Sequence, residues 1–146
     1  MVRKEKLIET RAQPEKAWEM LALDRMPEWM DGWKSVAFTS EVRNLEDKYR
    51  LGTSAYVTER HAKYDVEITE SLENERIVYR SKGIGGGRVT MTLTYILKPV
   101  EGGTEVTYAA SCGGWGILCS IVDGLLGENH LGVETSLNNL KSILEK

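Results

Sequence analysis

The chain has 146 residues, of which 41% are hydrophobic and 28% charged, so it is long enough for one domain with its own core. Its formal net charge of -3 excludes the concentrated basic face of a nucleic-acid-binding protein. Residues 1–10 lack the apolar stretch of a signal peptide, and no apolar run is long enough to span a membrane. We therefore expect a single domain over residues 1–146, cytoplasmic, without nucleic-acid binding or stable membrane insertion.

The N-terminal part of the chain predicts one strand followed by two short helices. Residues 4–11 alternate weakly, which is typical of an edge strand. Pro14 is favourable in the first turn of a helix, and Glu15 suits the positive end of the helix dipole. Pro27 disfavours helical backbone at the residue before it, so this helix ends there and a short helical turn follows over 27–30.

Six short segments between residues 33 and 112 predict strands. They cover 33–42, 53–61, 64–69, 77–79, 89–97 and 104–112. The clearest alternation places Val89, Met91, Leu93, Tyr95 and Leu97 between threonines. Short connections favour antiparallel neighbours, and we predict that Met91, Leu93, Tyr95 and Leu97 face the interior together with Tyr108.

Residues 115–146 predict one long helix. His130, Val133, Leu137, Leu140 and Leu144 recur at helical spacing and form one stripe. The first half of this segment is apolar on more than one side and rich in glycine. Such a segment is either buried on both sides or covers something removable: a ligand, a second subunit or a bilayer surface. A bend near Gly127 is the alternative to a continuous helix.

Several local motifs resemble the START-like superfamily, which includes polyketide cyclase/dehydrase and lipid-transport domains. Residues 12–18, in which a proline opens a helix that carries Trp18, are similar to the opening of these domains, and residues 27–29 are similar to their second short helix. Gly52, Glu70 and residues 103–108 resemble later landmarks, so the resemblance covers nearly the whole chain. It implies an α+β helix-grip fold, in which a curved seven-stranded antiparallel sheet surrounds a long C-terminal helix, two short helices follow the first strand, and a cavity lies between sheet and helix.

The resemblance implies a small, largely apolar ligand such as a lipid, a polyketide or a quinone-like molecule. Three functions stay open: binding or transport of this ligand in the internal cavity, cyclase or dehydratase catalysis on it, and a protein-interaction module that uses the apolar start of the last helix. A homodimer or a protein partner is compatible with the third. The superfamily has no universal catalytic motif, so the catalytic residues are unknown, and we expect no cofactor and no metal.

The candidate ligand-binding residues lie on inward strand faces, near chain reversals and on the last helix. They are Trp33, Tyr64, Met91, Leu93, Tyr95, Tyr108, Trp115, Leu126, His130 and Val133. His130 shares a face with Val133, so a continuous helix turns its imidazole inward, where it would bind a ligand carbonyl or act as an acid or base. A histidine that a core partner satisfies, or that faces solvent after a bend, is the alternative.

Two further groups bear on the chemistry of the interior. Glu59 and His61 share a strand face with Val57, whereas Arg60 lies on the opposite face, so either orientation brings an ionisable group inward, and a buried charge there needs a partner. An enzyme would take its acid or base from His130, His61 or a cavity carboxylate. The two cysteines, Cys112 and Cys119, form no metal motif, and we expect buried structural thiols.

Overall fold

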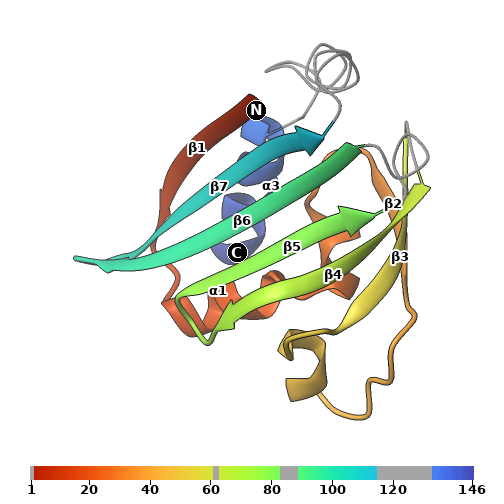
Figure 1. The fold of residues 1–146 in the computed structure, drawn as a ribbon. Helices are drawn as coiled ribbons and strands as arrows, with labels where there is room; N and C mark the ends of the chain where they lie inside the picture. The colour runs from red at the N-terminus through yellow and green to blue at the C-terminus, as the bar shows by residue number, and fades with distance from the viewer. Residues whose placement is uncertain (1, 61–62, 83–88, 115–132) are drawn as a thin grey trace.

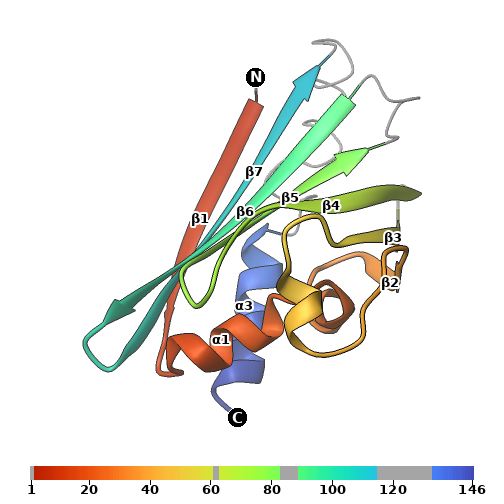
Figure 2. The ribbon, with the colours of Figure 1, turned by 60° about the horizontal axis from the view of Figure 1, so that its bottom comes forward.

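The computed structural model describes residues 2–60, 63–82, 89–114 and 133–146. Within them the strands form one seven-stranded antiparallel sheet, in the order β1-β7-β6-β5-β4-β3-β2. The strands are β1 (Val2–Thr10), β2 (Trp33–Phe38), β3 (Ser54–Glu59), β4 (Lys63–Leu72), β5 (Arg76–Lys82), β6 (Val89–Val100) and β7 (Gly103–Gly114). The sheet curves round the C-terminal helix (Figure 1, Figure 2), so the predicted α+β helix-grip architecture is confirmed.

Short helices lie on the concave side of the sheet (Figure 2). The described ones are α1 (Pro14–Met20), the 3-10 helices η1 (Leu23–Glu28) and η2 (Glu46–Tyr49), and α3 (Val133–Leu144). Pro14 takes the first helical position, where its missing N–H needs no partner. The second helix begins earlier than predicted and contains Pro27, and η2 is too short to produce a detectable period in the sequence.

The concave face of the sheet carries the core, as the alternation in β6 predicts. Leu93, Tyr95 and Leu97 are buried, and Tyr108 is buried beside Tyr95 on β7. Met91 is half-buried and packs against the same core. The predicted inward face of β6 is therefore confirmed, because burying every second side chain leaves the threonines between them on the other face.

Helix α3 closes the concave side. Leu137, Leu140 and Leu144 are buried, which confirms the described part of the predicted stripe. The backbone N–H of Asp31 donates a hydrogen bond to Ser136 Oγ at 2.8 Å, which ties α3 to the chain that follows η1. Residues 115–132, which the sequence predicts as the first half of this helix, lie outside the described residues. Among those that are described, no helix is long and apolar enough to cross a membrane.

A core truncation tests the inward face of β6. Leu93 is 5% exposed and Leu51 is 65% exposed, so the two leucines form a matched pair. We expect Leu93→Ala to lower the free energy of unfolding by about 2–5 kcal/mol, because the substitution leaves a cavity in packed surroundings. Leu51→Ala should change it by less than about 0.5 kcal/mol. Urea unfolding measures both, and equal losses in the two variants would contradict the assignment.

Candidate functional site

Four tyrosines, one from each central strand, occupy the concave face of the sheet. They are Tyr64 on β4, Tyr79 on β5, Tyr95 on β6 and Tyr108 on β7. The rings of Tyr95 and Tyr108 stack with their centroids 4.8 Å apart, and Tyr79 meets Tyr95 edge to face at 6.0 Å. Trp29 contacts Tyr95 from the side of the helices at 5.8 Å. The middle of the interior is therefore packed with aromatic rings.

The hydroxyl groups of Tyr79 and Tyr95 reach partners on the chain around η1. Tyr79 donates a hydrogen bond to the backbone carbonyl of Leu21, and Tyr95 Oη lies 3.5 Å from Met30 Sδ. Burial raises the pKa of Tyr79, Tyr95 and Tyr108 above the usual value for tyrosine. All three are therefore neutral at physiological pH and serve as uncharged hydrogen-bonding groups in an apolar interior.

A carboxylate lies at one end of this interior. Ala55 and Val57 are fully buried, so Glu59 on the same face of β3 also points inward, and its Oε2 accepts a hydrogen bond of 2.9 Å from the Tyr64 hydroxyl. Burial raises the pKa of Tyr64, and the charge of Glu59 raises it further. The same charge contributes to the raised pKa of Tyr108, so the carboxylate faces the tyrosine row.

Other side chains lie at the same end of the interior as this carboxylate. Trp33 pairs with Glu59 across β2 and β3, and its ring meets Tyr64 edge to face at 6.4 Å. Ser81 is buried on β5, and its hydroxyl accepts a hydrogen bond of 2.9 Å from the backbone N–H of Met91. The result is an apolar and aromatic wall with an acid, a phenol and a serine hydroxyl placed within it.

The structure brings six of the ten candidate ligand-binding residues onto one face. These six are Trp33, Tyr64, Met91, Leu93, Tyr95 and Tyr108, all on the concave side. Val133 is the first residue of α3. Trp115, Leu126, His130 and also His61 lie outside the described residues. The sequence did not single out Ser81, because an isolated serine in a strand carries no recognisable signal.

One expectation about the cysteines is wrong. Cys112 is buried at the end of β7 and is disulfide-bonded, so it is not the free thiol that the sequence suggested. The other cysteine of the sequence, Cys119, lies outside the described residues. Within the described part of the chain, no group of three or more His, Cys, Asp or Glu side chains is arranged to hold a metal ion.

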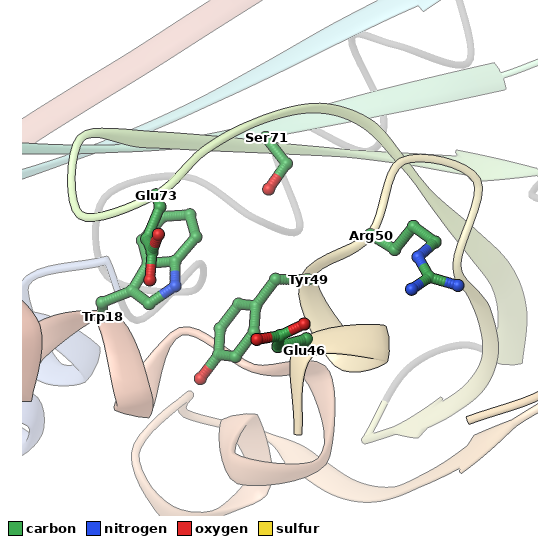
Figure 3. A pocket seen from close by; sticks show the side chains of 6 residues that line it. All are labelled: Trp18, Glu46, Tyr49, Arg50, Ser71 and Glu73. Atoms are coloured by element: carbon green, nitrogen blue, oxygen red, sulfur yellow. The ribbon is translucent and has the colours of Figure 1, made fainter. Parts of the chain in front are cut away.

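A second region lies at the opposite end of the strands, between α1, η2 and the β4–β5 turn. It contains a hollow of about 410 Å³ lined by Trp18, Glu46, Tyr49, Arg50, Ser71 and Glu73 (Figure 3). A hollow of about 200 Å³ adjoins it and shares four of these residues, with Glu15, Glu19, Leu45 and Asn74 added. Sequence reasoning missed this region, because three segments far apart in the chain form it. We call the two hollows together the Trp18–Tyr49 groove.

Solved structures of other proteins share the fold. A protein of Mesorhizobium loti is similar with a TM-score of 0.73 and 16% identity, covering 98% of this chain and 96% of its own. The Aha1 dimer of Colwellia psychrerythraea is similar with a TM-score of 0.68 and 19% identity, and the match covers 99% of this chain and 97% of that one. DynU16, a protein of the dynemicin biosynthetic locus, is similar with a TM-score of 0.65 and 17% identity. The match covers 97% of this chain but 46% of DynU16. No curated protein matches the sequence.

The family follows from the sequence. The model of the family described as Activator of Hsp90 ATPase homolog 1-like protein matches residues 11–145. The chain belongs to this family, and the predicted membership of the START-like superfamily is confirmed. Domains with this fold generally bind hydrophobic ligands. A relative that forms a dimer in solution shows that the fold allows a homodimer.

The buried tyrosines predict a loss of stability in alkali. Because the folded-state pKa of Tyr64, Tyr79, Tyr95 and Tyr108 is raised, the unfolded chain loses these protons first as the pH passes its ordinary tyrosine pKa of about 10. Stability is unaffected below that pH and falls above it, by about 1.4 kcal/mol per pH unit for each buried tyrosine. Urea unfolding at about pH 9 and about pH 11, with tyrosinate absorbance, measures this. Ionisation of these tyrosines without unfolding would contradict it.

Proposed function

We propose that this protein binds a small, largely apolar ligand in its interior, at the end of the sheet that carries Glu59 and Tyr64. The hydrogen-bonded Glu59–Tyr64 pair on the concave face is the observation that carries the proposal. A carboxylate that lies inside an apolar wall costs free energy unless it is paired or hydrogen-bonded. The Tyr64 hydroxyl offsets part of this cost, and a hydroxyl or amine on a ligand would be a further donor to the carboxylate.

The chemistry of the wall defines the ligand. Trp33, Tyr64 and Met91 offer aromatic and thioether surface, which suits a flat or flexible apolar body. Glu59 accepts hydrogen bonds, so it suits a hydroxyl or amine at one end of the molecule. A lipid alcohol, a polyketide or a reduced quinone has this combination. Ligands of this kind are typically held in sites of about 300–1,000 Å³.

The Glu59–Tyr64 pair also favours a second candidate, an enzyme of the cyclase or dehydratase type. In such an enzyme the Tyr64 hydroxyl would turn from Glu59 to the carbonyl oxygen of the ligand and stabilise it as it gains charge, while Glu59 takes a proton from the carbon next to that carbonyl. Catalysis of this kind requires both groups within reach of the same ligand. The carrier stays the leading proposal, because domains with this fold generally bind hydrophobic ligands.

We propose that the protein forms a homodimer, as the similar protein of Colwellia psychrerythraea does. We also propose a cytoplasmic location, where the disulfide at Cys112 would be of an uncommon kind.

Native mass spectrometry of the protein purified from its own host tests the proposal. We expect a co-purified apolar molecule in stoichiometric amount. Glu59→Gln should weaken its binding about tenfold, because a hydrogen bond to a charged acceptor is lost. Tyr64→Phe should also weaken it, since the phenol that orients the carboxylate is removed.

Tyr56→Phe is the matched control, since Tyr56 is 40% exposed on the outer face of the same sheet and should leave binding unchanged. Equal ligand retention by the wild type, Glu59→Gln and Tyr64→Phe, all folded, would contradict the proposed site. A bound molecule that is one water heavier in Glu59→Gln than in the wild type would favour the dehydratase over the carrier.

A further inference from the structure

The Trp18–Tyr49 groove is a formed surface feature, separate from the interior site. The rings of Trp18 and Tyr49 stack with their centroids 5.0 Å apart and an interplanar angle of 20°. The hydroxyl of Tyr49 donates a hydrogen bond of 3.2 Å to the backbone carbonyl of Glu19 on α1. In Figure 3 both rings lie below the β4–β5 turn, with Glu73 above them and Glu46 beside Tyr49. The groove therefore has an aromatic wall that is fixed in place before any partner binds.

Hydrogen bonds within η2 and the loops around it hold the other side of the groove. Asp47 accepts a hydrogen bond of 2.9 Å from the backbone N–H of Arg43, and its own N–H donates one of 3.0 Å to Asn44 Oδ1. Thr53 Oγ1 donates to the carbonyl of Asp47 at 2.6 Å. Asn74 adopts a φ of 62°, which asparagine tolerates better than most residues, and so forms the tight turn that carries Glu73. A preorganised surface of this kind loses little entropy when it binds.

The charge of the groove is strongly one-sided. Glu15, Glu19, Glu46 and Glu73 line it, and none of the four forms an ion pair with another described residue. Among the described residues that line the groove, Arg50 is the one basic side chain, and its charge is already paired with Asp47 at 2.8 Å. Burial raises the pKa of Tyr49 to about 12, and the negative charges of Glu19 and Asp24 contribute to this shift.

The groove also exposes apolar surface. Leu45 lines the smaller hollow and is 61% exposed. A leucine beside unpaired carboxylates and aromatic rings matches a partner that carries basic and apolar side chains together. Guanidinium groups bind carboxylates in a bidentate manner and stack on aromatic rings, so arginine suits this groove best.

We propose that the Trp18–Tyr49 groove docks a basic segment of a partner protein, with arginine or lysine next to an apolar side chain. The complementary charge of the four glutamates selects this occupant. The exposed leucine favours a peptide over a small polyamine, which has no large apolar side chain to bury against it. The groove and the interior site lie at opposite ends of the strands, so docking leaves the interior site accessible.

Selection of peptides from a random library displayed on phage tests this proposal. Enriched peptides should carry arginine or lysine beside apolar residues. The affinities of the synthetic peptides are then measured by fluorescence anisotropy for the wild type and for the double variant Glu46→Gln/Glu73→Gln. We expect binding to the double variant to be about three- to tenfold weaker, since two exposed charge pairs are lost, and salt should weaken binding to the wild type.

The double variant Glu101→Gln/Glu105→Gln is the matched control. It removes the same charge from the β6–β7 turn and from β7, away from the groove, and should bind as the wild type does. The proposal would be wrong if no peptide were enriched, or if the enriched peptides lacked basic residues. It would also be wrong if the synthetic peptides bound the wild type and the groove variant with equal affinity. Groove-dependent binding of spermidine without any enriched peptide would also overturn it, because the occupant would then be a polyamine.

Discussion

Buried hydroxyl and indole groups set the strongest constraint on this fold. A sheet whose concave face carries four tyrosines can close only if the chain above it supplies hydrogen-bond partners, because an unpaired buried polar group costs about 1–3 kcal/mol. The last residue of α1 and the one after it supply two of them. The Leu21 carbonyl accepts from Tyr79, and the Met20 carbonyl accepts from Trp29 Nε1 at 2.8 Å. The placement of the helices on the sheet follows from these bonds, as the view of their positions in Figure 2 illustrates.

The same constraint divides the interior into two parts. Where Tyr79, Tyr95 and Tyr108 pack against one another and against Trp29, aromatic rings occupy the concave face. Towards the other end of the strands, Tyr64 turns its hydroxyl to Glu59 instead of to the backbone of a helix. The polar group at that end is thus a carboxylate side chain, which accepts hydrogen bonds. The function that we propose depends on this difference between the two ends.

The sequence predicted the strands and their inward faces because a period of two is a direct record of one-sided burial, as Leu93 and Leu97 show. It identified Tyr64 and Trp33 as candidates but did not identify their contact with Glu59, which depends on the pairing of β2, β3 and β4. The Trp18–Tyr49 groove has no local signal at all. Its walls come from α1, η2 and the β4–β5 turn, and their contact is a property of the tertiary structure alone.

We infer that an apolar ligand enters at the Glu59–Tyr64 end and not among the packed rings. Methyl NMR of the methionines during a titration with naphthol, a small apolar phenol, tests this inference. Met91 lies beside Ser81 at the same end of the sheet as Glu59, whereas Met20, in α1, and Met26, in η1, are buried on the helix side of the packed rings. Our account predicts that the Met91 methyl signal shifts in a saturable manner while those of Met20 and Met26 stay in place. Saturable shifts of Met20 and Met26 with an unchanged Met91 would contradict it.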